Sequence, residues 1–149
     1  MKRNSRLSSV LHLLLHIDEA APRVLTSEQL AGFINTNPVV VRRTIVGLRE
    51  AGIVVSERGP GGGWRLGRAP GEISIADVCA ALGESLLPFS TEPESPGCAV
   101  EEAVMAALED FRREAELLLA ARLSKVTLAD MVAGFRRRRA GKGVTVHAV

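Results

Sequence analysis

The side chains that could carry acid–base, redox or metal chemistry are few in this sequence. Among its 149 residues there are two cysteines, three histidines and no tyrosine. Two cysteines cannot form a disulfide framework, and by themselves they cannot supply the four ligands of a structural zinc or iron–sulfur site. General acid–base catalysis depends most often on histidine, which is scarce here. We therefore predict that the protein is not an enzyme and has no catalytic residue, no metal and no cofactor.

The two cysteines differ in their predicted surroundings. Cys79 falls on the apolar face of a predicted helix, where it is interpreted as a small core residue. Cys98 follows Gly97 at the start of the longest predicted helix, where unpaired backbone N–H groups favour a reactive thiolate. Glu101 and Glu102 oppose that effect because they are negatively charged. Cys98 therefore stays open as either an inert residue or a redox sensor.

Two of the histidines are spaced as a helical pair. His12 and His16 are four residues apart in a predicted helix over 5–19, a spacing compatible with shared metal ligation. No cysteine or second carboxylate cluster accompanies them in the sequence. They are interpreted as solvated or interface histidines on the polar side of the helix. The opposite, apolar side is formed by Leu7, Val10, Leu11, Leu14 and Ile17.

The charge of the chain is unevenly distributed. Hydrophobic residues make up 46% of the sequence and charged residues 24%, so a chain of this length is expected to fold alone as one unit. The net charge is +2, but residues 1–70 carry +5, residues 71–134 carry −8 and residues 135–149 carry +5. A basic front beside an acidic middle is expected when only one part meets a polyanion. Nucleic acid is therefore the first partner to test.

Neither a membrane nor a secretory route is expected for this protein. No apolar run approaches the roughly 18 residues that a membrane helix needs, and no signal peptide precedes the first helix. The predicted location is the cytoplasm, with no membrane partner.

Two short helices joined by a polar turn form a helix-turn-helix candidate. Thr26 and Gln29 have capping-box spacing and start a helix over 27–34. Asn37 is a suitable N-cap and Pro38 a suitable first residue for the next helix, which runs to about Ala51. This arrangement is typical of DNA-binding proteins, in which the second helix enters the major groove.

The faces of that second helix support the interpretation. Its inner side is predicted to be Val41, Ile45 and Leu48. The outer side would carry small or apolar residues around one long hydrogen-bond donor, with Arg42 and Arg49 on one flank. Its predicted members are Val39, Arg43, Val46, Gly47 and Glu50. The competing interpretation is a solvated helix with incidental valines and glycine.

A glycine-rich hairpin follows directly. Strand-like runs at 53–56 and 64–66 bracket the sequence RGPGGG at 58–63, which predicts a hairpin with a flexible tip. A helix-turn-helix followed by such a hairpin is a winged helix, whose wing contacts the phosphate backbone or the minor groove. A nucleotide site is disfavoured because neither Gly-Lys-Ser/Thr nor G-x-G-x-x-G opening a helix is present.

The rest of the chain is predicted to be helical apart from one loop. Ser74 caps a helix that ends at Gly83, and a Pro-rich loop follows over 84–97. The longest helix spans 99–123, and the last one starts at Thr127 and leads into the arginines at 136–139. The long helix carries a heptad seam, for which self-association is the favoured role. The seam residues, and hence the predicted dimer interface, are Val104, Leu108, Phe111, Ala115 and Leu118.

These residues resemble a known family. The sequences LREAGIV at 48–54 and RGPGGGWRL at 58–66 are similar to those of the Rrf2 family of bacterial transcription regulators. The resemblance extends through ISIADV at 73–78 and the long helix to TLAD at 127–130, so it covers nearly the whole chain. It implies a winged helix that dimerises through the long helix and binds palindromic promoter DNA with two recognition helices.

Carried over by position, the resemblance makes 37–51 the recognition helix and Arg58 the wing contact. The sequence departs from the iron–sulfur subgroup of this family, which has three cysteines between the fourth helix and the dimerisation helix, because this region has Cys98 alone. It also has Arg42 and Arg43 where cluster-binding relatives tend to have Glu and Gln. The predicted DNA contacts are Asn37, Val39, Val40, Arg42, Arg43 and Gly47 of the recognition helix, with Arg58, Gly61 and Gly62 of the wing.

The expected fold is mainly α with a small β-hairpin wing. A winged helix-turn-helix domain is expected at 1–83, a linker at 84–97, the dimerisation and C-terminal helices at 98–139 and a flexible tail at 140–149. The expected function is that of a sequence-specific DNA-binding transcriptional regulator, a homodimeric repressor that binds a palindromic operator, without an iron–sulfur cluster. The alternatives are a winged-helix protein-interaction module and a thiol-based redox regulator using Cys98. An unidentified small-molecule effector also stays open.

Overall fold

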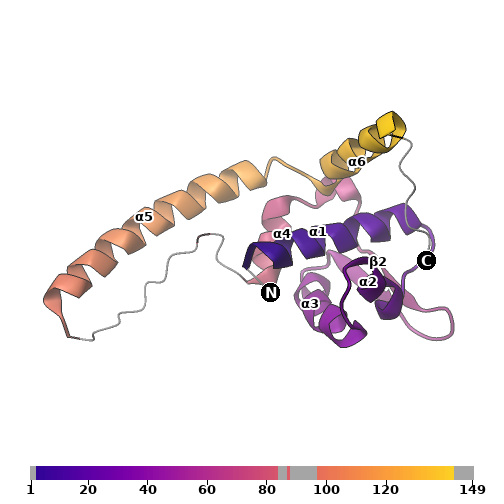
Figure 1. Ribbon diagram of the computed structural model, residues 1–149, viewed down its shortest axis with the longest axis horizontal. Helices are drawn as coiled ribbons and strands as arrows, with labels where there is room; N and C mark the ends of the chain where they lie inside the picture. The colour runs from indigo at the N-terminus through magenta and orange to yellow at the C-terminus, as the bar shows by residue number, and fades with distance from the viewer. Residues whose placement is uncertain (1–2, 84–86, 88–96, 143–149) are drawn as a thin grey trace.

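The computed structural model describes residues 3–83, 87 and 97–142. Within these residues the chain forms six α-helices, one two-stranded antiparallel hairpin and one short 3-10 turn, so the mainly helical winged fold is confirmed. Figure 1 shows their arrangement in space. The elements are α1 Arg3–Ala20, α2 Ser27–Phe33, α3 Pro38–Glu50, β1 Val54–Glu57, β2 Gly63–Leu66, η1 Pro70–Glu72, α4 Ile75–Leu82, α5 Ala99–Leu123 and α6 Leu128–Lys142.

The starts of three helices are fixed by the caps that the sequence predicts. The Thr26 hydroxyl accepts a hydrogen bond from the Gln29 backbone N–H at 3.2 Å, and the Gln29 side chain accepts one from the Thr26 N–H at 3.0 Å. The Asn37 side-chain oxygen accepts from the Val40 N–H at 3.0 Å and starts α3. Ser74 caps α4 in the same way, accepting from the Asp77 N–H at 3.0 Å. These caps determine where α2, α3 and α4 begin.

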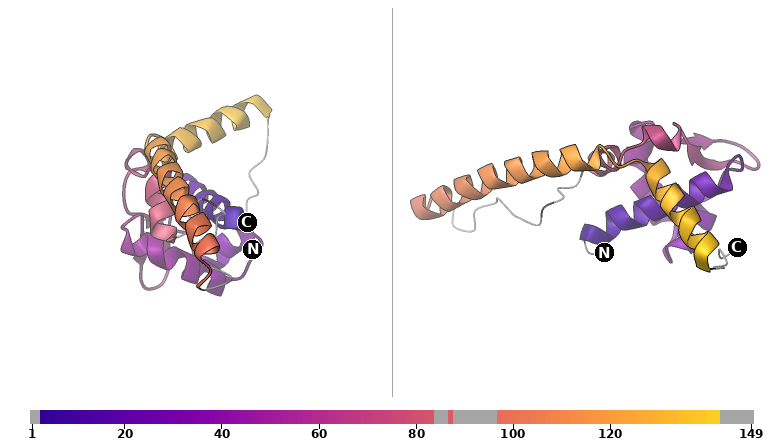
Figure 2. Two further views of the ribbon diagram at one scale, coloured as in Figure 1. Left: turned by 90° about the vertical axis from the view of Figure 1, so that its left-hand side faces the viewer. Right: turned by 90° about the horizontal axis from the view of Figure 1, so that it is seen from above.

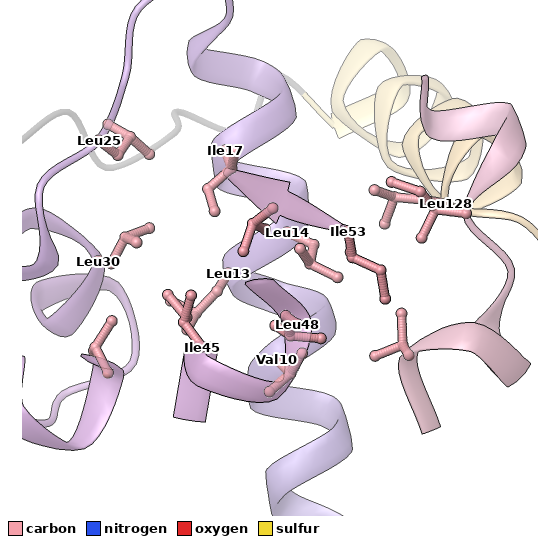
Figure 3. Packing of buried hydrophobic residues seen from close by; sticks show 14 of the residues in the cluster. Val10, Leu13, Leu14, Ile17, Leu25, Leu30, Ile45, Leu48, Ile53 and Leu128 are labelled. Atoms are coloured by element: carbon pink, nitrogen blue, oxygen red, sulfur yellow. The ribbon is translucent and has the colours of Figure 1, made fainter. Parts of the chain in front are cut away.

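The hydrophobic core lies between α1, the helix-turn-helix, the base of the wing and α4 (Figure 3). On α1 the buried residues are Val10, Leu13, Leu14 and Ile17, whereas Leu7 and Leu11 are only half-buried. The burial of Leu13 and the half-burial of His16 differ from the single apolar stripe expected for this helix. The reason is that α1 is in contact with α2, β2 and α4 as well as with α6.

The C-terminal helix packs with the N-terminal elements. Leu128 is 1% exposed and belongs to the core cluster. The chain around it is held by backbone hydrogen bonds from the Leu128 N–H to the Ile73 carbonyl at 2.8 Å and from the Ile75 N–H to the Val126 carbonyl at 2.9 Å. Figure 2 shows α6 crossing beside α1. In the structure α6 thus packs against η1 and α1, contacts that the predicted grouping of this helix with the long helix did not include.

The end of α6 also differs from the prediction. The helix continues to Lys142, three residues beyond the predicted end of the ordered chain at 139. The Arg136 side chain donates to Glu19 of α1 at 3.1 Å, and Arg139 lies 3.5 Å from the same carboxylate. These contacts hold the basic end of α6 against the acidic end of α1. The remaining part of the predicted tail, 143–149, lies outside the described residues.

The long helix α5 extends away from the rest of the structure (Figure 1). It has 25 residues, and none of them is buried. Most of the predicted linker at 84–97 lies outside the described residues. Across the described ranges, no helix is both long and apolar enough to cross a membrane.

Candidate nucleic-acid interface

The recognition helix α3 has one buried face and one exposed face. Val41, Ile45 and Leu48 are at most 1% exposed and anchor the helix in the core. On the other side Val39 is 62% exposed, Val46 is 41% exposed, and Arg43 is also exposed. This pattern leaves apolar side chains and a guanidinium facing solvent along a helix whose position is fixed from behind.

The two adjacent arginines of α3 have different surroundings. The Arg42 guanidinium donates a hydrogen bond to the Glu28 carboxylate of α2 at 3.1 Å, with both side chains more than half exposed. Hydrogen bonding by its own backbone N–H, and then by Thr26 and Arg42, lowers the pKa of Glu28. Arg43 has no such pairing among the described residues. Arg43 is thus free to reach a base or phosphate, whereas Arg42 would have to share or leave Glu28.

Gly47 does not lie on the outer face of α3, and this corrects the expectation from the sequence. A Cβ atom at this position would collide with the backbone carbonyl oxygen of Ala81. The glycine is therefore explained by the close approach of α3 and α4. The periodicity of an ideal helix places Gly47 on the side of α3 opposite Val41, Ile45 and Leu48. The sequence alone does not show that α4 packs against this part of the helix.

We expect Gly47→Ala to destabilise the protein. The clash is with backbone, which cannot rotate away, so overpacking should cost about 1–3 kcal/mol in the free energy of unfolding. Gly32→Ala is the matched control, because that helical glycine has no atom within 4 Å of an added Cβ. The control should be neutral or more stable by about 0.5–1 kcal/mol, since alanine favours the helix. Urea denaturation of both variants measures the difference, and equal stabilities would contradict the packing role of Gly47.

The wing is a short hairpin with an exposed basic tip. Its register pairs Val54 with Leu66 and Glu57 with Gly63. Gly59 and Gly61 have positive φ angles of 94° and 74°, which glycine adopts without strain. A Cβ at Gly62 would collide with the carbonyl oxygen of Glu57. The glycines thus set the shape of the tip, and Arg58 is exposed beside them.

The base of the wing is attached to the start of α2, which the sequence did not predict. The Trp64 N–H donates to the Leu25 carbonyl at 2.8 Å, and the Leu25 N–H donates back to the Trp64 carbonyl at 3.1 Å. The Trp64 indole N–H donates to the Ser27 hydroxyl at 3.0 Å. These bonds fix the orientation of the wing relative to the helix-turn-helix. The sequence around Thr26 indicated only a helix cap. It did not indicate that Leu25, the residue before the cap, forms a single β-bridge with Trp64.

The predicted seam of α5 is largely exposed. Val104 is 49%, Phe111 is 55% and Leu118 is 75% exposed, whereas Leu108 and Ala115 are half-buried. Exposed apolar side chains at a heptad spacing are typical of a helix that pairs with another helix. In the single chain, α5 therefore has an exposed apolar face.

Comparisons with known proteins identify the family. The family model described as "Rrf2: Iron-dependent Transcriptional regulator" matches residues 3–134. YwnA of Bacillus subtilis, which is described as an HTH-type transcriptional regulator, is 33% identical over 132 residues, which are 87% of this chain and 96% of YwnA. The chain belongs to the Rrf2 family. Its DNA-binding fold and its role as a transcriptional regulator follow from that membership.

Solved structures agree with the Rrf2 assignment. A crystal structure of a protein described as DNA-binding is 31% identical, with a TM-score of 0.65, covering 85% of this chain and 97% of that one. IscR of T. potens has a TM-score of 0.62 and covers 99% of this chain, and at 20% identity it supports the fold alone. The winged-helix architecture is thus shared with the Rrf2 family.

The described residues do not bring together the donors of an iron–sulfur cluster such as part of the Rrf2 family holds. Cys79 is 8% exposed inside α4, and burial raises the pKa of its thiol, which disfavours a thiolate ligand. Cys98 is exposed at the N-cap of α5. Within the part of the chain that the structure describes, no three His, Cys, Asp or Glu side chains are grouped to hold a metal ion. Among these residues, the two cysteines are therefore not grouped with the further donors that a cluster needs.

Proposed function

We propose that this Rrf2-family protein is a homodimeric, sequence-specific repressor that acts on a palindromic operator in the cytoplasm. The N-terminal half of α3 enters the major groove, and the wing lies along the adjacent backbone or minor groove. The protein acts by occupying DNA and has no catalytic activity. The contacts are Asn37, Val39, Val40, Arg42 and Arg43 of α3, with Arg58 and the glycines of the wing.

The observation that carries this proposal is the outward face of α3. Exposed Val39 and Val46 suit contact with thymine methyl groups, and Arg43 suits a bidentate contact with guanine. Arg58 lies on the exposed wing, where a guanidinium serves for phosphate or minor-groove contact. The buried face of α3 holds these groups at fixed positions, which is a requirement for reading a sequence rather than only binding charge.

The dimer is supported by α5. One chain presents one recognition helix, and a helix-turn-helix reads a palindrome when two-fold symmetry presents two. The exposed seam of α5 supplies an apolar surface that a second copy would cover. The absence of a cluster is supported by the donor set of the chain, with one exposed cysteine.

Selection of DNA fragments from the source genome by the purified protein tests the proposed function. We expect a single enriched palindromic motif. Affinity for a duplex that contains it should fall steeply as salt rises, because phosphate neutralisation releases counterions. A winged-helix protein-interaction module, the rival in another class, would enrich no sequence over random duplex, and that result would reject the proposed binding to a specific operator.

Arg43→Ala is expected to weaken operator binding and to relax sequence preference at one major-groove position. Loss of a guanidinium that reads a base costs about 1–3 kcal/mol on the preferred site. Arg58→Ala should instead weaken binding to all sequences and reduce the salt dependence, because it removes a backbone contact. Affinities on the selected operator and on single-base variants measure both effects.

Arg113→Ala is the matched control for these two variants. It removes an exposed arginine from the side of α5 opposite the seam, which has no part in the proposed DNA-binding surface or the proposed dimer interface. Its affinity should equal that of the parent. If the Arg43 and Arg58 variants also bind as tightly as the parent at moderate salt, the assigned DNA-binding face is wrong.

A thiol-based signal is the second candidate mode of regulation, favoured by the exposure of Cys98. This residue is the N-cap of α5, and its side chain makes no capping hydrogen bond. Oxidation there would add polar bulk at the start of the helix proposed to join two subunits. If Cys98 is the sensor, peroxide will change the operator affinity of the parent and not of Cys98→Ser. Equal responses in the two proteins would exclude a sensor role.

A further inference from the structure

Two histidines of α1 face each other outside the proposed DNA-binding surface. The Nε2 atoms of His12 and His16 are 3.0 Å apart, and the ring centroids are 4.8 Å apart. The His16 ring stacks on Phe33 of α2, with a centroid distance of 3.7 Å and an interplanar angle of 5°. The His16 ring is thus held in place by a second helix, and the exposed His12 ring is turned towards it.

This geometry matches two neighbouring ligands of a transition-metal ion. Histidine nitrogen binds such ions at about 2.0–2.1 Å. Two ligands at right angles around one ion are therefore separated by about 3.0 Å, as in the tetragonal sites that Cu²⁺ and Ni²⁺ prefer. The spacing of the two Nε2 atoms already has this value before any ion is present. The sequence alone could not show this, because histidines four residues apart can also point away from each other.

We propose that His12 and His16 bind one divalent transition-metal ion of the class that prefers imidazole. Water completes the coordination. Solvent reaches the pair from the side of His12, whose side chain is exposed.

Metal binding at this pair would stabilise the packing of α1 against α2. The ion fixes the His16 ring, and that ring contacts Phe33 at the end of α2, the first helix of the helix-turn-helix. A ligand that binds the folded state and not the unfolded state raises the midpoint of thermal unfolding. The metal would therefore act on stability whether or not DNA is bound.

Titration of the untagged full-length protein with Ni²⁺, and separately with Cu²⁺, tests the proposal by calorimetry and electron paramagnetic resonance. We expect one ion per chain and, for Cu²⁺, couplings to two nitrogen atoms. His12→Gln should weaken binding by on the order of 10²-fold, because a second linked ligand no longer raises the effective concentration. His16→Gln should have the same effect. His147→Gln is the matched control and should bind as the parent does, since it removes the third histidine of the chain.

Thermal unfolding with and without Ni²⁺ provides the second measurement. The metal should raise the midpoint of the parent and of His147→Gln, and leave that of His12→Gln unchanged. His12 is exposed, so its variant should unfold without metal at the temperature of the parent. Binding of equal strength by the parent and His12→Gln, or no binding by the parent at millimolar metal, would overturn the proposal and leave the pair as a hydrogen bond between two rings.

Discussion

The double variant Phe111→Glu, Leu118→Glu is expected to be a folded monomer that has lost operator affinity. The two side chains are 55% and 75% exposed in the single chain, so replacing them should leave the fold of each subunit intact. In the proposed dimer they lie near the two-fold axis, where four carboxylates would be buried close together. Burial of unpaired charge is costly, and like charges repel, so association should fail.

The loss of operator affinity follows from the loss of one recognition helix. A single subunit reads one half-site, and specific binding should fall towards the non-specific level, by about 10³-fold or more. Sedimentation at micromolar concentration measures the oligomeric state, and titration of the operator duplex measures affinity. Circular dichroism confirms that the variant is folded.

The double variant Ala106→Glu, Ala120→Glu is the matched control. It adds the same two carboxylates to exposed positions of α5, each two residues beyond a seam position and hence on the opposite side of the helix. The control should remain dimeric and bind the operator. A parent protein that sediments as a monomer at micromolar concentration would refute the dimer, and a control as defective as the double variant would refute the assignment of the seam.

Leu128→Ala is expected to cost about 2–5 kcal/mol in the free energy of unfolding. Leu128 is 1% exposed and belongs to the same core cluster as Ile53 and Ile73, although it opens the last helix (Figure 3). Truncation of the Leu128 side chain leaves a cavity in the core at the start of α6. The fluorescence of Trp64, the single tryptophan, reports unfolding of the winged domain in which it lies.

Leu117→Ala is the control for this variant because Leu117 is 67% exposed and lies outside the seam. Its stability should lie within about 0.5 kcal/mol of the parent. Both variants are compared at one protein concentration, because the stability of a dimer depends on concentration. If Leu128→Ala is no more damaging than Leu117→Ala, α6 is not part of the core of the winged domain.

The sequence by itself determined the local structure of this protein. Thr26, Asn37 and Ser74 predicted helix starts that the structure confirms, because a cap acts within four residues of the chain. Val41, Ile45 and Leu48 predicted the buried side of α3, because helical periodicity repeats over one element. The glycines between two strand-like runs predicted the wing. The motif on which the family resemblance rests lies within these local elements.

The contacts between helices and strands that are distant in sequence are determined by the tertiary structure alone. Gly47 is a packing residue because Ala81 of α4, which is 34 residues later in the chain, covers that side of α3. The assignment of α6 to the winged domain, the pairing of Arg42 with Glu28 and the stacking of His16 on Phe33 likewise depend on contacts between separate elements. Periodicity and capping describe each element alone. Contacts between elements depend on how the whole chain buries its apolar surface, and no local pattern records that.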